Sequence, residues 1–298
     1  MRRPWLAVSL ALLAISAAGC SCAAEIGGDD GGMSPRFDGE SPELDADGML
    51  DARTVLPDGR VVDCAPASCG GFLRLCGDCL DNDGDGLVDS EDPACIGPCD
   101  DTEDRYDLDI RDTPTCMRDC YYDNDQGSGN DGCAYDARCD ELSPDAPTCV
   151  YTPGGGGIAC PDTQPPLCDD VCGPLVPNGC DCFGCCELPA GSGTFVYLGG
   201  VDEASGTRIC SPETVGDPTI CRPCTPYGPC LNDCGRCELC LGRTELPAEC
   251  LPSDGGAPAD GGTPPPRCEP GVQACGLPSD PPCADGLYCL TGCCIFFG

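Results

Sequence analysis

The chain has 298 residues, including 34 Cys, 42 Gly and 32 Pro, and its formal net charge is −36. This Cys content is typical of disulfide-bonded proteins in oxidising compartments and argues against a cytosolic protein. The sequence contains no His and no Lys, which excludes His-based triads, Schiff-base lysines, phosphate-loop lysines and His metal ligands. The acid excess argues against nucleic acid as a partner and favours cations.

Residues 1–19 predict a bacterial lipoprotein signal peptide. Arg2 and Arg3 precede an apolar run over residues 5–18, which is too short to span a membrane comfortably. Ala17-Ala18-Gly19-Cys20 resembles the lipobox, with Ala where Leu is usual. The resemblance implies diacylation of Cys20, cleavage before it, and a membrane anchor in the cell envelope, at the outer membrane. The alternative is ordinary cleavage near the Ala residues, which would give a secreted protein.

The composition changes along the chain and predicts several small disulfide-rich modules, mostly irregular with short β-strands. Residues 20–63 predict a disordered acidic tether. The best strand candidate is 194–198, and 60–63 is a weaker one. The remaining segments, in order, are a Cys-rich module with an acidic loop (64–99), a Cys-rich acidic module (100–150), a dense Cys-rich module (151–250), a Gly/Pro linker (251–266) and a C-terminal knot with six cysteines (267–298).

The cysteines predict disulfides throughout the body. Cys20 and Cys22 stand apart, and the 32 cysteines from Cys64 onward are compatible with up to sixteen bridges, with Cys22 left over. In an exported chain the Cys-x2-Cys pairs indicate disulfides rather than zinc sites. Adjacent cysteines, as at Cys185-Cys186 and Cys293-Cys294, are too close to bridge each other comfortably, so each should pair elsewhere. The sequence leaves the connectivity open.

The segment 81–92 carries the strongest chemical signal, because it fits D-x-D-x-D-G with an acidic twelfth position. Alternate side chains bring hard oxygen ligands around one cation, and Gly86 permits the sharp turn. The candidate Ca²⁺ ligands are Asp81, Asp83, Asp85, the Leu87 carbonyl, Asp89 and Asp92. Asp at position 12 is shorter than the usual Glu, so we expect weak binding, with a Kd of about 10⁻⁴–10⁻³ M. The alternative is a solvated acidic turn.

The cysteine-flanked segment 76–95 resembles the calcium loops of thrombospondin type 3 repeats. It also resembles the D-N-D-G-D-G-x-x-D metal-binding motif of bacterial surface proteins. We predict that a Cys79–Cys95 bridge clamps this loop. A second acidic loop is a weaker candidate, with Asp123, Asp125 and Asp131 as its carboxylates.

The whole chain resembles a group of Cys-rich lipoproteins from Gram-negative bacteria, with stretches such as PNGCDCFGCCELP and CELCLGR. Some members carry the name tryptophan synthase alpha chain, but the (β/α)₈ barrel of that enzyme cannot be traced here. The sequence favours a structural or adhesive envelope protein that binds an unspecified protein or surface polymer, and not an enzyme. Thiol-based metal sequestration and a secreted enzyme with paired carboxylates stay open as alternatives.

Overall fold

The structure is a computed structural model, and it describes residues 53–55, 59–108, 116–123, 131–146, 148–158, 160–200, 209–250 and 267–297. The predicted signal peptide, Cys20, most of the predicted tether, Asp125 and the 251–266 linker lie outside the described residues. All the described residues belong to one compact unit.

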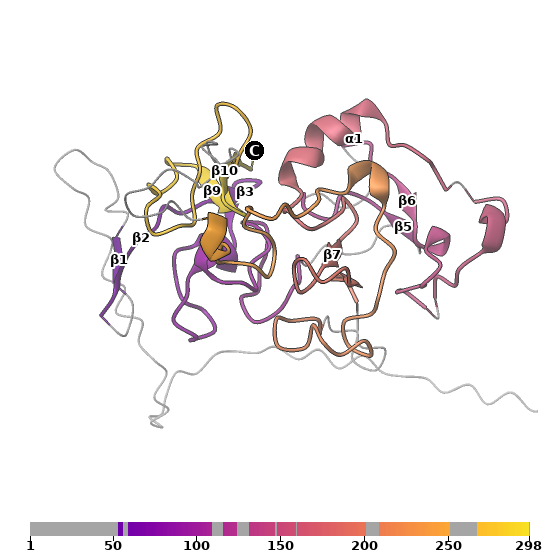
Figure 1. Ribbon diagram of the computed structural model, residues 1–298, viewed down its shortest axis with the longest axis horizontal. Helices are drawn as coiled ribbons and strands as arrows, with labels where there is room; N and C mark the ends of the chain where they lie inside the picture. The colour runs from indigo at the N-terminus through magenta and orange to yellow at the C-terminus, as the bar shows by residue number, and fades with distance from the viewer. Residues whose placement is uncertain are drawn as a thin grey trace, which may run out of the picture. The chain divides into compact units, whose positions relative to one another are not determined.

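The described chain is mostly irregular, with short antiparallel strand pairs, one short α-helix and several 3₁₀ turns (Figure 1). This confirms the predicted fold class. The strand pairs are β1 (Arg53–Val55) with β2 (Val61–Asp63), β3 (Ser68–Cys69) with β4 (Phe72–Leu73), β5 (Met117–Arg118) with β6 (Tyr135–Asp136), β7 (Cys185–Glu187) with β8 (Phe195–Tyr197), and β9 (Leu287–Leu290) with β10 (Cys293–Phe296). The helices are α1 (Pro166–Val171), η1 (Leu75–Gly77), η2 (Asp89–Glu91), η3 (Ala137–Cys139), η4 (Pro153–Gly155), η5 (Gly173–Leu175), η6 (Gly228–Cys230) and η7 (Ala248–Cys250).

Gly and Pro keep these elements short. Pro166 opens α1, where its fixed φ suits the first helical position, and Pro174 follows soon after the helix ends. Thr291 and Gly292 both have positive φ, the backbone that a tight two-residue turn requires, and they connect β9 to β10. The strands predicted at 194–198 and 60–63 are confirmed as β8 and β2.

The N-terminal boundary of the folded body differs from the prediction. The composition predicts a tether through residue 63, but β1 pairs with β2, and Thr54 lies opposite Val62. The β-branched residues of both strands flank a Pro-Asp-Gly sequence, a combination that favours a hairpin over a solvated tether. The folded part therefore includes residues 53–55, which precede the first body cysteine.

Sixteen disulfides join all 32 cysteines from Cys64 onward, and each stays inside one of three blocks. Block A spans residues 64–99, block B residues 116–250 and block C residues 268–294. Within block B, no bridge links the segments 116–172, 180–230 and 234–250 to one another. The pairs are 64–79, 69–99 and 76–95 in block A; 116–149, 120–172, 133–168, 139–160, 180–186, 182–230, 185–224, 210–221, 234–240 and 237–250 in block B; and 268–293, 275–289 and 283–294 in block C.

This connectivity corrects two expectations. The predicted Cys79–Cys95 bridge is wrong, because Cys79 pairs with Cys64 and Cys95 pairs with Cys76. The backbone at Cys79 is left-handed, with φ of 63°, and this reversal after η1 sends the two cysteines of the Cys-x2-Cys pair to different partners. Three bridges also cross the predicted boundary between residues 150 and 151, so those two segments are covalently joined.

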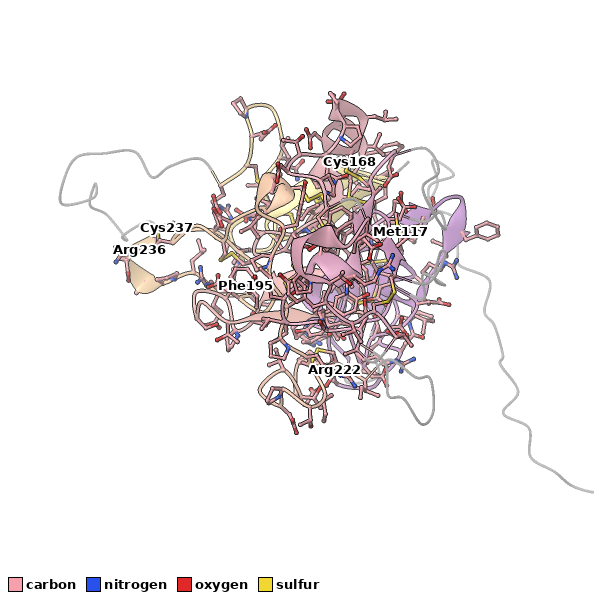
Figure 2. The ribbon with its side chains drawn as sticks, turned by 90° about the vertical axis from the view of Figure 1, so that its right-hand side faces the viewer. Met117, Cys168, Phe195, Arg222, Arg236 and Cys237 are labelled. Atoms are coloured by element: carbon pink, nitrogen blue, oxygen red, sulfur yellow. A yellow bond between two sulfur atoms is a disulfide. The ribbon has the colours of Figure 1, made fainter. Side chains whose placement is uncertain are left out.

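Half-cystines and tyrosines make up much of the core. One cluster of buried side chains includes residues of all three blocks, and half-cystines are its most numerous members. Cys168 and Cys237, both bridged, lie well apart in Figure 2, so the sulfur is spread through the body. Phe183 stacks on Tyr135, with ring centroids 5.1 Å apart. Sulfur and aromatic rings thus supply the apolar contacts that few aliphatic side chains are present to make.

Buried acids in this core are satisfied mainly by backbone N–H groups. The Asp181 carboxylate accepts hydrogen bonds from the N–H groups of Phe183 (2.9 Å), Cys185 (2.9 Å) and Tyr227 (2.7 Å). Burial nevertheless raises the pKa of Asp181 to about 6, although these bonds and the Arg118 charge oppose the shift. Acidic side chains therefore accept the backbone hydrogen bonds that carbonyl groups would accept in regular secondary structure.

Candidate metal centre

The acidic loop of residues 81–92 follows η1 and contains η2, and its own carboxylates accept hydrogen bonds that shape its turns. Asp81 accepts hydrogen bonds from the N–H groups of Gly84 (2.7 Å) and Gly86 (3.0 Å). Asp83 accepts one from Asp85 N–H (2.9 Å), and both glycines have positive φ. Asp residues in such positions form local turns readily, and Gly tolerates the left-handed backbone.

Three predicted ligands converge. Asp81, Asp83 and Asp85 each offer a carboxylate oxygen, and these three oxygens lie within 4.8 Å of one another. A Ca²⁺ ion 2.3–2.6 Å from each ligand permits oxygens up to about 5 Å apart. The spacing therefore suits one cation. Asp83 and Asp85 are exposed, so their proximity alone is also what a solvated turn would show.

Asp92 supplies an observation that a solvated turn does not explain. Its side chain is only 4 % exposed, and Oδ1 accepts a hydrogen bond from Ala94 N–H at 2.7 Å. Its Oδ2 is buried and has no hydrogen-bond partner among the residues that the structure describes. Burial raises the pKa of Asp92 to about 7, and the charges of Asp85, Asp83 and Glu103 add to the effect. A buried carboxylate oxygen without a donor is costly unless a cation binds it.

Asp89 does not join the other predicted ligands. Both of its carboxylate oxygens accept from Cys79 N–H, at 3.2 and 3.0 Å. Burial raises the pKa of Asp89 to about 8, opposed by the Cys79 bond and supported by the charges of Asp78 and Glu103. The Asp89 side chain therefore accepts hydrogen bonds from the backbone at the base of the loop. Leu87 donates its N–H to Asp85 Oδ1 at 2.7 Å.

Glu103 is the residue that sequence reasoning missed. It is 3 % exposed, and its carboxylate accepts from Asn82 N–H and, at 3.2 Å, from Asp89 N–H. It therefore holds both ends of the loop from outside it. Burial raises the pKa of Glu103. Nothing in the acidic run around residue 103 distinguishes this Glu from its neighbours, so only burial reveals it.

These side chains line a cavity of about 170 Å³, which we call the acidic hollow. Six of its residues carry carboxylates. Its lining residues are Asp83, Asp85, Asp92, Pro93, Ala94, Glu103, Asp104, Pro212 and Glu213.

No family model, curated protein or solved structure matches this chain. Its functional interpretation therefore rests on its own residues and their geometry. None of the described helices combines the length and apolar character that a membrane span requires.

The second predicted acidic loop is described only in part. Asp123 and Asp131 are buried, and each offers an oxygen near the sulfur of Cys120. Asp131 accepts hydrogen bonds from the N–H groups of Cys120 (3.2 Å) and Cys133 (2.9 Å). Both of these cysteines are bridged, so their sulfurs are not thiolate ligands. Asp131 therefore acts as a backbone acceptor beside two disulfides.

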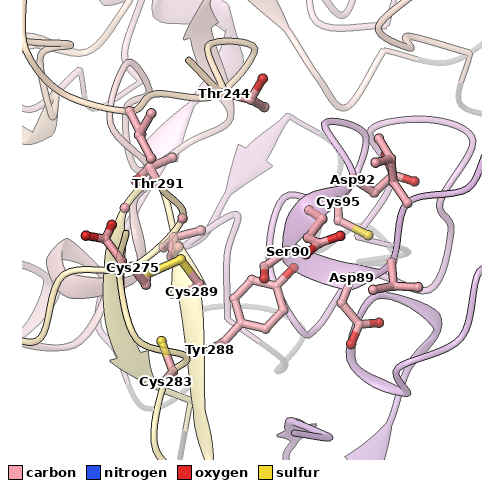
Figure 3. A pocket seen from close by; sticks show the side chains of 18 of the residues that line it. Asp89, Ser90, Asp92, Cys95, Thr244, Cys275, Cys283, Tyr288, Cys289 and Thr291 are labelled. Atoms are coloured by element: carbon pink, nitrogen blue, oxygen red, sulfur yellow. A yellow bond between two sulfur atoms is a disulfide. The ribbon is translucent and has the colours of Figure 1, made fainter. Parts of the chain in front are cut away.

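A larger cleft of about 630 Å³ lies between residues of blocks A, B and C. Figure 3 shows Tyr288 reaching from β9 toward Asp89 and Ser90. Tyr288 is 5 % exposed, and its hydroxyl has no hydrogen-bond partner within the described part of the chain. Asp92 lines both this cleft and the acidic hollow. The cleft mixes apolar and polar groups and does not converge on one ligand chemistry.

Proposed function

We propose that this chain is an exported cell-envelope protein, anchored through Cys20, whose loop 81–92 binds Ca²⁺. Its role is structural or adhesive, toward a protein or surface polymer. The observation that carries the calcium site is the buried Oδ2 of Asp92, which has no hydrogen-bond partner among the described residues. Asp92 is one of the residues that line the same hollow as Asp83 and Asp85. A cation there would neutralise charges that the fold holds together.

Calcium is favoured by the chemistry of the donors. All candidate side-chain ligands are carboxylates, which are hard oxygen donors that suit Ca²⁺ and Mg²⁺ rather than soft metals. The sequence has no His, and every described cysteine is bridged, so neither imidazole nor thiolate is available in the described part. Ca²⁺ accepts irregular sets of six to eight oxygens, whereas Mg²⁺ demands a near-ideal octahedron. An uneven loop site therefore favours Ca²⁺.

The envelope location is supported by the N-terminal pattern and by the disulfides. Sixteen bridges require an oxidising compartment, and the lipobox resemblance supplies the anchor. Metabolic labelling of cells with a fatty acid, comparing the natural protein with Cys20→Ser, tests this. We expect the label to disappear in the variant, and persistent labelling would contradict the anchor.

Calorimetric titration of the oxidised full chain with CaCl₂ tests the metal site. We expect binding with a Kd of about 10⁻⁴–10⁻³ M for the natural protein. Asp83→Asn and Asp85→Asn should each weaken it at least tenfold, since ligand charge sets affinity. Asp285→Asn is the matched control, because Asp285 is exposed and lines neither cavity. If Asp83→Asn and Asp85→Asn bind Ca²⁺ as tightly as the natural protein, the assignment of the calcium site is wrong.

Thiol-based metal sequestration is separated from this proposal by a count of free thiols. The bridged cysteines of blocks A, B and C leave no thiol in the described residues. We expect labelling of the denatured, unreduced protein to find few free thiols. A large number would favour a thiol metal store instead.

A further inference from the structure

The disulfides leave the three blocks without covalent cross-links to one another. All three bridges of block A close within residues 64–99, and the bridges of block B begin at Cys116. Between these blocks, only the peptide chain itself is continuous. The position of block B against block A therefore depends on non-covalent contacts.

The acidic hollow lies where these two blocks meet. Asp83, Asp85 and Asp92 come from block A, whereas Pro212 and Glu213 come from block B. Glu103 and Asp104 follow block A in the chain and complete the wall.

Backbone and side-chain contacts hold the Glu213 segment at this place. Tyr106 N–H donates to the Cys210 carbonyl at 2.9 Å, which ties the chain after Glu103 to the segment before Glu213. Ser211 donates its hydroxyl hydrogen to Glu213 Oε2 at 2.9 Å and orients that carboxylate. Burial raises the pKa of Tyr106, and the charges of Glu213 and Asp92 raise it further. Both carboxylates therefore act on the same buried ring.

A cluster of acids alone does not make a site, but Asp92 adds an independent feature. Its Oδ2 is buried, has no hydrogen-bond donor and belongs to a side chain that lines the hollow. Asp104 contacts Arg105 at 2.7 Å. Among the described side chains, it is the one carboxylate lining the acidic hollow that has an ion-pair partner. The concentration of negative charge around Asp92 thus has a local cost that a divalent cation would offset.

We propose that the calcium ion of the loop is also bound by Glu103 and Glu213, and that it joins block A to block B. This proposal rests on the calcium site proposed above and adds the ligands from outside the loop. It assigns Glu213, 121 residues beyond the last loop position, a direct role in binding. The ion then acts as a reversible cross-link between two parts that sulfur leaves unlinked.

The size of the hollow agrees with a hydrated calcium ion. A cavity of about 170 Å³ holds several water-sized groups, since a water molecule occupies about 30 Å³ in the liquid. Ca²⁺ fills its six to eight positions with carboxylates and waters together. Glu213 can therefore bind directly or through one bound water, and in both cases the ion connects the blocks.

Hydrogen exchange with mass spectrometry on the oxidised full chain, with and without CaCl₂, tests the cross-link. In the natural protein we expect Ca²⁺ to slow exchange both in the loop and in residues 209–214. Glu213→Gln should retain slowing in the loop, lose it in residues 209–214, and bind Ca²⁺ about tenfold more weakly by calorimetry. Glu245→Gln is the matched control, because Glu245 is an exposed block B residue that lines neither cavity.

The outcomes separate this proposal from the calcium site itself. Slowing in the loop without slowing in 209–214 overturns the cross-link and leaves the loop site intact. A Glu213→Gln protein that matches the natural one in exchange and affinity also overturns it. If Ca²⁺ changes exchange in neither segment and calorimetry detects no binding, the cross-link and the calcium site both fail. Glu213 is exposed, so its substitution should not disturb folding.

Discussion

Replacing Asp92 by Asn should raise stability in the absence of calcium, and calcium should offset this gain. In the calcium-free protein at pH 8, Asp92 is ionised although its pKa is about 7 rather than 3.8. At about 1.36 kcal/mol for each pH unit, this difference sets an upper bound of about 4 kcal/mol on the cost to the fold. Solvent screening reduces that cost. The amide oxygen of the substituted side chain would still accept from Ala94 N–H, and the side chain would carry no charge. We therefore expect Asp92→Asn to raise the free energy of unfolding by about 1–2 kcal/mol.

Calcium should offset most or all of this gain, because it stabilises the natural protein more than the variant. With a Kd of about 10⁻³–10⁻⁴ M, 10 mM Ca²⁺ stabilises the natural protein by about 1.4–2.7 kcal/mol through mass action. The Asp92→Asn protein has lost the closing ligand and should gain less than about 0.5 kcal/mol. A binding site with uncompensated charge commonly lowers the stability of the ligand-free protein in this way.

Guanidinium unfolding with the disulfides intact measures both effects, at pH 8 in EGTA and in 10 mM CaCl₂. Asp285→Asn controls for the loss of one surface charge. If Asp92→Asn lowers the unfolding free energy by more than about 1 kcal/mol in EGTA, Oδ2 must have a donor in the native state. The interpretation of Asp92 as an uncompensated ligand would then be refuted.

Three further predictions concern the fold. Burial raises the pKa of Asp89 to about 8 and that of Asp92 to about 7 in the folded protein. The stability that these two protonated groups contribute is therefore fully present below about pH 4 and is lost as pH rises through 7–8. Unfolding free energy of the calcium-free protein should therefore fall between pH 5 and pH 9, and a rise in a guanidinium series would contradict this. Asp181→Ala leaves three buried N–H groups without their acceptor and should cost about 2–4 kcal/mol in the same assay, whereas no loss would show that water replaces the carboxylate. Complete reduction should abolish the native near-UV circular dichroism, because bridges contribute roughly 2–4 kcal/mol each, and a native spectrum after reduction would refute the dependence on sulfur.

The general architecture was predictable from composition and local pattern. A Cys-rich chain with many Gly and Pro residues can form only short elements, and the structure has them. The strand at β8 was predictable because Phe195, Val196 and Tyr197 are aromatic or β-branched and glycines lie on both sides of them. The acidic loop was recognisable because its carboxylates follow one another at fixed spacing, so the chain alone brings three of them together.

The remaining parts of the site depend on distant segments. Glu103 and Glu213 reach the hollow because the fold carries Cys210 to Tyr106, and no local pattern marks either acid. The contact between Asp89 and the Cys79 N–H group was not predictable for a similar reason. The left-handed turn at Cys79 presents an N–H group that Asp89 binds, and spacing within the loop does not encode this.

Disulfides and the proposed calcium ion would stabilise different parts of the molecule. The disulfides constrain each block from within, and none of them links one block to another. A cation in the acidic hollow would restrain block A against block B, and it would leave when the calcium concentration falls below its Kd. We expect calcium depletion to loosen the contact between these blocks while each bridged segment stays folded, because its bridges are unaffected. Exchange should then rise in residues 209–214 and in the loop, and should stay constant at Phe183 and Cys185, which lie inside block B. A uniform rise across all three blocks would mean that calcium stabilises the whole body and has no particular role where the blocks meet.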